Sequence, residues 1–245
     1  MEFWSLKGWI PYSKGLALQQ SLVDLRVQDQ LGDTVLFLEH LPVITRGRGL
    51  QFTGENRPKQ MPFSPPVSPE IEFFEIERGG DLTYHGPGQW VMYPICKLNG
   101  QGFAPFHDVS GFLRKLEAAL IDELKALGLD AGVKPQATGV WIQDKKVASI
   151  GIAVRKWVTF HGLALNCIND LKPFYGISPC GFAPEVMTRL LDWIPMASDE
   201  LGWLLWRDCL EKSMACRLAS EVSSVQKILK LSLQEVEKKI SSLKF

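Results

Sequence analysis

Three segments with strand character follow one another in the second half of the chain, with only a few residues between them. Residues 138–143 and 146–154 are separated by Asp144 and Lys145 alone, which predicts a hairpin. Residues 157–168 form a further predicted strand. Runs of strands without regular strand–helix–strand alternation are typical of α+β proteins. We therefore expect an α+β fold, a sheet with helices that pack mainly on one face.

The remaining elements are predicted from apolar spacing and from residues that start or stop helices. Ser13 is a candidate cap for a helix that continues to Val27. Gly128 is the predicted stop of a helix over 106–127. In the tail, Ser232 and Glu235 form a possible capping box. Further strands are expected at 3–10, 34–39, 70–77 and 90–96, and further helices at 200–218 and 220–243.

The composition restricts the class of protein. The 245 residues carry 27 basic and 27 acidic side chains, and this balance argues against a nucleic-acid partner, because nucleic-acid-binding domains usually have a basic excess. No segment has the length and apolar character of a membrane span, and the first residues do not resemble a signal peptide. The five cysteines include no CxxC pair, which indicates free thiols in a reducing compartment. We expect a cytoplasmic protein without a membrane partner.

The segment from Arg78 to Gln89 combines four glycines and a proline with polar side chains. So many glycines cost backbone entropy, and they permit a ligand to approach the main chain closely. The segment therefore predicts a binding loop; the alternative is an elaborate turn between two strands. It is neither a dinucleotide-binding fingerprint nor a Walker loop, since GxGxxG and GK[ST] are both absent. Another long loop is expected at 51–69.

Cys180 lies between Pro179 and Gly181, which predicts a tight, accessible loop rather than a packed strand or helix. A thiol needs a nearby cation or base to be nucleophilic at neutral pH, and Lys146 is the candidate. The alternative is an inert loop cysteine and a surface lysine.

Two histidines beside glycines, His85 and His161, raise the question of a zinc site with Cys180. They lack the paired ligand spacing of zinc sites. We therefore expect no metal, and we interpret both histidines as hydrogen-bonding residues that shape a pocket. Cys96 and Cys167 occupy apolar strand positions and are interpreted as buried small hydrophobic residues.

Five blocks of sequence occur together in one order: RGGDLTYHGPGQWVMYPI, TGVW, KVASIGI, HGLALN and ISPCGF. In this order and spacing they resemble the lipoyl(octanoyl) transferase family, the octanoyl-[acyl carrier protein]:protein N-octanoyltransferases. An earlier block, HLPVITRGRG, is similar to a motif of the same family but has Leu41 where proline is usual. The resemblance extends over residues 35–190, and the chain after residue 201 lies outside it.

The resemblance implies the fold of the catalytic module of biotin and lipoate protein ligases, which is an α+β fold with a mixed sheet and flanking helices. We expect a catalytic domain at 1–200 and a helical C-terminal extension at 201–245. It implies that Cys180 is the nucleophile, that Lys146 lowers the pKa of its thiol, and that no cofactor is needed. The substrate contacts of the family fall on three blocks of this chain: Arg78, Gly79, Gly80, Asp81, Leu82, Thr83, Tyr84 and His85; Ser149, Ile150 and Gly151; and Gly162, Leu163 and Ala164.

The reaction that the resemblance implies is octanoyl or lipoyl transfer, the first step of protein lipoylation. An octanoyl group passes from acyl carrier protein to Cys180 as a thioester. It then passes to a lysine of a lipoyl domain, in 2-oxoacid dehydrogenase subunits or in the glycine cleavage H protein. Amide formation from a thioester is downhill, so no ATP is required. Gly151 and Gly162, with Ile150 and Leu163, are expected to line a tunnel for eight carbons.

An acidic carrier protein predicts a local basic patch at the mouth of the pocket, although the whole chain is neutral. Arg46 and Arg48 are candidates because they lie in a glycine-rich loop. Arg155 and Lys156 are candidates because they lie at a predicted strand end, which we expect to be near Lys146.

Three other functions remain open. An ATP-dependent lipoate ligase shares the fold, but it does not need Cys180, and no adenylate-binding loop is found in this sequence. An amidotransferase that moves octanoyl or lipoyl groups between lipoyl domains shares the thiol chemistry and differs in its donor. A non-catalytic acyl-binding module keeps the pocket with an inert thiol, and the presence of both Lys146 and Cys180 argues against it.

Overall fold

The computed structural model describes residues 1–49, 71–135, 137–177, 183–195, 199–219 and 227–243. No helix in these ranges is both long and apolar enough to cross a membrane. The strands are β1 (Glu2–Ile10), β2 (Thr34–His40), β3 (Val43–Arg46), β4 (Glu72–Glu75), β5 (Leu82–His85), β6 (Gln89–Ile95), β7 (Ala131–Lys134), β8 (Ala137–Ile142), β9 (Lys145–Arg155), β10 (Val158–Asn166) and β11 (Ile228–Leu231). The α-helices are α1 (Tyr12–Val27), α2 (Val109–Ala126), α3 (Glu200–Leu218) and α4 (Leu233–Ser242), and the short 3-10 helices are η1 (Lys172–Gly176), η3 (Pro184–Val186) and η4 (Leu190–Asp192).

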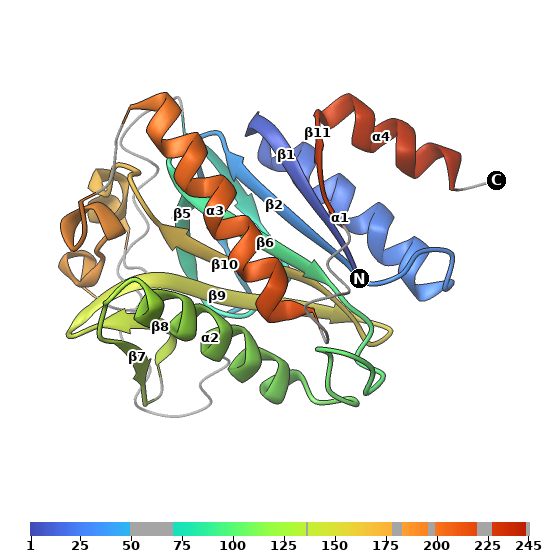
Figure 1. Cartoon of the computed structure of the whole chain (residues 1–245), viewed down its shortest axis with the longest axis horizontal. Coiled ribbons are helices and arrows are strands. Elements are labelled where there is room, and N and C mark those ends of the chain that lie inside the picture. Colours follow the sequence, from blue (N-terminus) through green and yellow to red (C-terminus); the bar gives the residue numbers. More distant parts are fainter. Residues whose placement is uncertain (50–70, 136, 178–182, 196–198, 220–226, 244–245) are drawn as a thin grey trace.

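The strands form one large and one small sheet. The large sheet has the order β11-β1-β2-β6-β10-β9-β8-β7, and the small sheet has the order β4-β3-β5. β1 runs parallel to β2 and β11, whereas the other neighbours in the large sheet pair antiparallel. This mixed sheet with flanking helices (Figure 1) is the predicted α+β fold. The predicted hairpin is present as β8–β9, and β10 continues it.

Helices cover both faces of the large sheet. α2 and α3 lie on one face, and α1 and α4 lie on the other (Figure 1). The side chains of β2 show the reason, because Val35 and Phe37 join the apolar cluster of the first face while Leu36 and Leu38 join that of the second. A strand that is apolar on both sides has to be covered twice. The expectation of helices mainly on one face is therefore wrong.

The C-terminal part of the chain contributes the helix α3, the strand β11 and the helix α4 to these layers. α3 adds Trp203 and Met214 to the core cluster that it shares with α2. β11 then extends the sheet beside β1, with Phe3 opposite Ile228. The prediction of one helix over 220–243 is therefore wrong where β11 lies, because short apolar runs fit a strand or a helix equally well until their neighbours are known. The domain boundary at residue 200 stays a prediction.

Helix ends follow local chemistry. Asp108 caps α2 by accepting a hydrogen bond from Gly111 N at 2.7 Å, and Gly128, with φ of +82°, follows its last turn as predicted. The capping box of Ser232 and Glu235 is confirmed at the start of α4. Ser13, however, is not a cap. Pro11 precedes the first residue of α1 instead, with φ of −53° and without a side-chain hydrogen bond.

The small sheet is not predicted by the sequence pattern. β5 lies inside the glycine-rich segment, and it pairs antiparallel with β3, Thr45 opposite Thr83. β3 and β5 have four residues each, which is too short for an alternation of apolar and polar residues to stand out. β4 corresponds to the strand predicted at 70–77, and it is shorter than predicted.

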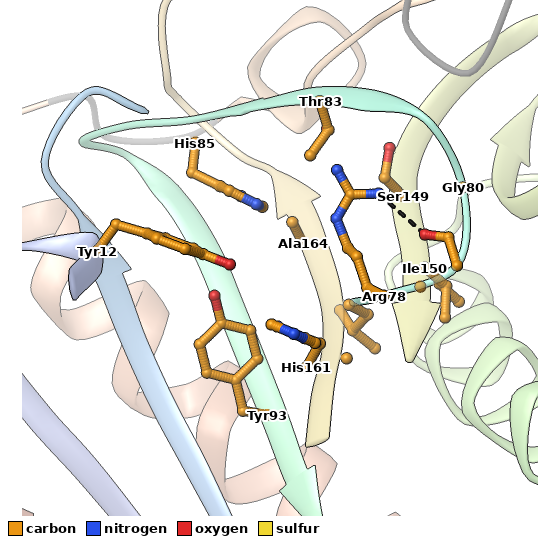
Figure 2. A pocket seen from close by; sticks show the side chains of 14 residues that line it. Tyr12, Arg78, Gly80, Thr83, His85, Tyr93, Ser149, Ile150, His161 and Ala164 are labelled. Atoms are coloured by element: carbon orange, nitrogen blue, oxygen red, sulfur yellow. Dashed lines mark hydrogen bonds between the residues drawn. The ribbon is translucent and has the colours of Figure 1, made fainter. Parts of the chain in front are cut away.

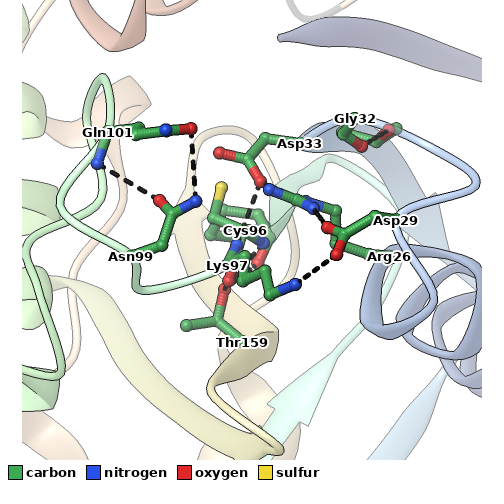
Figure 3. A network of polar contacts seen from close by, with 11 residues as sticks. Arg26, Asp29, Gly32, Asp33, Cys96, Lys97, Asn99, Gln101 and Thr159 are labelled. Carbon is green, nitrogen blue, oxygen red and sulfur yellow. Dashed lines mark hydrogen bonds and ion pairs between the residues drawn. The ribbon is translucent and has the colours of Figure 1, made fainter.

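A network of polar contacts joins the end of α1, the start of β2 and the end of β6 (Figure 3). Asp33 Oδ1 accepts from Arg26 Nε at 2.7 Å and from Lys97 N at 3.0 Å. Asp29 accepts from Lys97 Nζ at 2.6 Å and pairs with Arg26 as well. These contacts hold the three elements together at this end.

Gly162 allows β10 and β6 to pair. A Cβ at this position would lie 2.1 Å from the carbonyl oxygen of Met92. We expect Gly162→Ala to push the strands apart and to lower the free energy of unfolding by about 3 kcal/mol, measured by urea denaturation. Gly132→Ala in β7 is the matched control, because a Cβ there meets no atom within 4 Å. The control should change the free energy of unfolding by less than about 1 kcal/mol, and equal effects would contradict the assignment.

Candidate active site

A cavity lies beside the glycine-rich segment, where distant parts of the chain meet (Figure 2). Its walls come from that segment, from the middle of β9, from β10, and from single side chains of α1 and β6. The three sequence blocks that we expect to contact substrate therefore converge. The lining residues are Tyr12; Arg78, Gly79, Gly80, Thr83 and His85; Tyr93; Ser149, Ile150 and Gly151; and His161, Gly162, Leu163 and Ala164.

Three residues of the first block do not line the cavity. Successive side chains of a strand point to opposite sides. Thr83 and His85 of β5 therefore face the cavity, whereas Leu82 and Tyr84 pack in an apolar cluster outside it. Asp81 lies at the edge, and its carboxylate is 3.8 Å from the guanidinium of an arginine in β3.

The buried side chain of Arg78 ties the glycine-rich segment to β3. Its Nη2 donates to the carbonyl and hydroxyl oxygens of Thr45, at 2.9 and 3.0 Å, and to the carbonyl oxygen of Asp81 at 2.8 Å. Its Nη1 donates to the carbonyl oxygen of Gly79 at 2.9 Å (Figure 2). An arginine remains protonated at physiological pH. The wall of the cavity therefore holds a fixed positive charge.

Glycines let this segment approach its neighbours on two sides. A Cβ on Gly47, next to β3, would lie 2.3 Å from the carbonyl oxygen of Gly80. A Cβ on Gly151, in β9, would lie 2.7 Å from the carbonyl oxygen of Gly79. Gly79 N also donates to the carbonyl oxygen of Ile152 at 3.0 Å. Close backbone approach is therefore a second reason for glycine at position 151, beside the tunnel that we expected it to line.

Hydrogen bonds fix the tautomer of His85. Gln89 Nε2 donates to Asn166 Oδ1 at 2.9 Å and to a backbone carbonyl, so Gln89 Oε1 is the acceptor for His85 Nδ1 at 2.7 Å. His85 is therefore protonated on Nδ1, and its Nε2 is an acceptor. The series continues from Asn166 Nδ2 to Thr188 O at 3.0 Å, and from Thr188 N to Lys146 O at 3.0 Å. Hydrogen bonds thus join the cavity to the backbone of Lys146.

Two buried histidines, His85 and His161, line the cavity, and a third, His40, is buried next to His85. The rings of His40 and His85 are 5.8 Å apart. Burial lowers the pKa of His40 to about 4 and the pKa values of His85 and His161 to about 3, and the positive charge of Arg78 lowers the latter two further. All three rings are therefore neutral at pH 7. In the described part of the chain, no three His, Cys, Asp or Glu side chains gather as metal ligands do.

Two tyrosines complete this inner wall (Figure 2). His40 Nδ1 donates to a backbone carbonyl at 2.8 Å, so its Nε2 accepts from the hydroxyl of Tyr93, also at 2.8 Å. Burial raises the pKa values of Tyr12 and Tyr93 above the ordinary value. His161 has φ of +57°, and its buried Nε2 has no hydrogen-bond partner among the described residues. Neutral polar groups therefore form the inner wall.

Sequence reasoning did not find Tyr12 or Tyr93. Tyr12 follows Pro11 at the start of a helix, and Tyr93 lies in an apolar strand, so both look like ordinary core aromatics. His161 was expected to shape the pocket by hydrogen bonding. It does line the cavity, although the bond that it makes is from its backbone N, to Gln19 Oε1 at 2.7 Å.

The cavity is narrow. Its volume is about 30 Å³, whereas a cavity that binds benzene has about 150 Å³. An eight-carbon chain therefore fits here only if lining side chains move apart. The apolar side chains Ile150 and Leu163 are the members of the lining that suit contact with such a chain.

Lys146 lies on β9, three residues before the first lining residue of that strand, and its side chain is 2% exposed. Its Nζ is 5.8 Å from the centre of the Trp141 ring. Gly139 makes room for it, because a Cβ there would lie 2.7 Å from Lys146 Cε. The backbone of Lys146 pairs with Met187. Cys180 lies outside the described residues.

One half of the expected basic patch, Arg155 and Lys156, is not near Lys146 as expected. Arg155 and Lys156 lie at the opposite end of β9, which at about 3.3 Å per residue is roughly 30 Å from Lys146. Arg155 is also paired with Asp24 at 2.6 Å. Their expected position was wrong because a strand of this length carries its two ends far apart. Arg46 lies 3.8 Å from two carboxylates. These negative charges offset its positive charge, so Arg46 attracts an acidic partner only weakly.

Because these histidines are neutral in the folded chain, we expect the protein to lose stability in acid. A histidine whose folded pKa is below its unfolded value of about 6.5 gains its proton mainly in the unfolded chain, so stability falls as the pH drops below 6.5. Each such group contributes about 1.4 kcal/mol per pH unit until its folded pKa is reached. We expect His161→Asn, which suits a positive φ, to reduce the loss in unfolding free energy between pH 6.5 and pH 5 by about 2 kcal/mol in urea titrations. An unchanged slope would contradict a neutral His161.

Comparisons with known proteins agree on one family. The model of the lipoyl protein ligase A/B catalytic domain matches residues 11–202. An octanoyltransferase from Geobacter sp. is 40% identical over 210 residues, which cover 86% of this chain and 92% of that protein. Octanoyltransferases from Dictyoglomus thermophilum and Nostoc sp. are each 41% identical, over 74% and 77% of this chain and 73% and 81% of theirs.

Solved structures support the same fold. A Thermoplasma acidophilum protein of the lipoate protein ligase type, solved with lipoic acid, has a TM-score of 0.65 at 15% identity and covers 99% of this chain and 93% of its own. Lipoate-protein ligase A, solved with ATP, has a TM-score of 0.63 at 15% identity with the same coverage. At these identities the likeness concerns the fold alone. With the family model and the 40% identical relatives, it leads to one conclusion: the chain belongs to the lipoyl protein ligase A/B catalytic domain family.

Proposed function

We propose that this protein is an acyltransferase that moves an octanoyl group from the thioester of acyl carrier protein to a lysine of a lipoyl domain. The observation that carries the proposal is the cavity between β9 and β10, together with the buried Lys146, which lies on β9 three residues before the first residue of that strand to line the cavity. The family and the octanoyltransferase relatives support the choice of acyl group. The acceptors that we propose are the lipoyl domains of 2-oxoacid dehydrogenases and the glycine cleavage H protein.

Cys180 and Lys146 are the proposed catalytic residues. Lys146 is held in place by its backbone pairing with Met187 and by the bond from Thr188 N. Residues on both sides of 178–182 also pack together, because Ile177 and Met187 share one apolar cluster. Met187, which pairs with Lys146, therefore lies in the same cluster as Ile177, and this supports the proposed contact of Lys146 with Cys180.

The reaction has two steps. The Cys180 thiolate attacks the thioester carbonyl, the new S–C bond forms, and the C–S bond to the carrier breaks; the carrier's sulfur leaves as a thiol with a proton from the Lys146 ammonium. The amine of the acceptor lysine then attacks the acyl-enzyme, the amide C–N bond forms, and the Cys180 thiolate leaves. Lys146 as an ammonium stabilises the thiolate, and as a neutral amine it takes the proton that the acceptor loses.

A reducing compartment suits this chemistry, because a nucleophilic thiol has to stay reduced. The four cysteines that the structure describes form no disulfide. Cys96 and Cys167 are buried, and burial raises their pKa values well above the ordinary one, so neither is suited to the role of nucleophile. We propose a cytoplasmic location on these grounds.

Replacing the nucleophile should abolish transfer. We expect Cys180→Ala to reduce octanoyl transfer by roughly a thousandfold or more, because no covalent intermediate can form. Intact mass of the wild type after mixing with octanoyl-carrier protein should show one octanoyl adduct, located at Cys180 by peptide mapping. Cys209→Ala, at an exposed position on α3, is the control and should retain both activity and adduct. Transfer by Cys180→Ala, or an adduct elsewhere, would rule out the covalent mechanism.

The proposed role of Lys146 is to lower the pKa of the Cys180 thiol. We expect Lys146→Ala to raise the pKa of the Cys180 thiol towards about 8.5 and to slow transfer by roughly 10²- to 10⁴-fold. Iodoacetamide labelling of the Cys180 peptide against pH measures the shift. Lys145→Ala is the matched control, since this neighbour is exposed and its Nζ donates to Glu185 O. If the labelling midpoint of Lys146→Ala stays unchanged, the activating group lies elsewhere, with His85 as the next candidate.

A further inference from the structure

The carboxylate of Glu39, at the end of β2, connects the glycine-rich segment to α3. Its Oε2 accepts from Gly88 N at 2.7 Å. Its Oε1 accepts from Trp203 Nε1 at 3.0 Å and from Arg207 Nη1 at 2.8 Å. Glu39 is 3% exposed and Arg207 is 5% exposed, so water does not compete for these bonds. One buried carboxylate is therefore shared between the candidate site and the tail of the chain.

Arg207 is itself held on three sides. Besides its bond to Glu39, Nε donates to Glu211 Oε1 at 2.8 Å and Nη2 donates to Leu6 O at 2.9 Å. The guanidinium is planar and presents its donors in a fixed fork, so these partners determine its orientation. Arg207 in turn determines where Oε1 of Glu39 lies, and hence where Oε2 meets Gly88.

The turn that Glu39 holds is tightly fitted. Gly88 has φ of +80°, and a Cβ on it would lie 2.7 Å from Ile168 Cγ1 and 2.9 Å from Asn169 N. Its carbonyl accepts from Ile168 N at 3.0 Å. Gln89 is the next residue, and it makes the 2.7 Å bond to His85 Nδ1. A displacement of Gly88 therefore passes directly to the side chain that fixes the His85 tautomer.

We propose that Arg207 is a positioning residue for the cavity. It fixes Glu39, Glu39 fixes the turn at Gly88, and the turn holds Gln89 against His85. α3 is accordingly a part of the site's architecture and not only a cover for the sheet. Nearly all of this helix lies beyond the residues matched by the family model, which end at 202. The kinetic part of the proposal rests on the proposed octanoyl transfer, and the spectroscopic part does not.

Another ion pair of α3 supplies a matched control. Arg217 Nε donates to Glu123 Oε2 of α2 at 2.8 Å, and this pair does not include the turn. Arg217→Met therefore removes a contact between α3 and its surroundings while the Glu39 cluster stays complete. Arg207→Met removes the contact that leads to the cavity. Arg207→Lys keeps the charge and loses the fork of donors.

The test compares these variants by ¹⁵N NMR of the histidine rings and by octanoyl-transfer kinetics, with melting curves to choose a temperature at which each is folded. The four histidines of the chain keep the ring spectrum simple. We expect Arg207→Met to change the ¹⁵N shifts of His85 and to lower kcat by roughly 10- to 100-fold with a smaller change in KM, as misplacement of a catalytic-site group does. Arg207→Lys should recover part of kcat. Arg217→Met should melt earlier but keep the His85 shifts, with kcat within about twofold of the wild type.

The outcomes distinguish a positioning role of Arg207 from a role in stability alone, and both from a failure of the proposed octanoyl transfer. If Arg207→Met and Arg217→Met alter the His85 shifts and kcat equally, Arg207 acts only through stability and the proposal is overturned. If Arg207→Met does not fold, Arg207→Lys decides: altered His85 shifts support the proposal, and wild-type shifts overturn it. If the wild type transfers no octanoyl group, the proposed function fails, while the His85 shifts still report whether Arg207 positions the turn.

Discussion

A buried guanidinium needs oxygen atoms that accept from its donors, and the chain around Arg78 supplies four of them to its two terminal nitrogens. Oxygen atoms of Thr45, Gly79 and Asp81 point inward to accept from it. The backbone can turn these carbonyls inward only if it passes very close to its neighbours, which explains the glycines at positions 47 and 151. The shape of the cavity wall therefore follows from satisfying one charge.

The same charge also acts on the histidines of the cavity. Burial already disfavours protonated histidines, and the guanidinium disfavours them further. The inner wall is consequently lined by neutral imidazoles and phenols, which an alkyl chain can contact without stripping water from an ion.

The sequence predicts three neighbouring strands of the large sheet well because they are long and close in the chain. The segments at 138–143, 146–154 and 157–168 needed only short turns to pair, and the structure has them as β8, β9 and β10. The converging blocks around Arg78, Ser149 and Gly162 were found by their composition and by family resemblance. β3, β11 and Tyr12 could not be found in this way, because their roles depend on partners far away in the sequence. Cys180, the residue expected to matter most, lies outside the described residues.

The position of β1 in the sheet has a consequence for how the chain folds. β1 pairs with β2 soon after it in sequence, but its other edge pairs with β11, so Phe3 meets Ile228 more than two hundred residues later. Contacts at such separation form slowly, because the loop between them has to close first. During synthesis one edge of β1 stays unpaired until β11 has emerged, and an unpaired edge is where strands of other molecules attach. The chain is thus prone to aggregate during the long interval between the synthesis of β1 and that of β11.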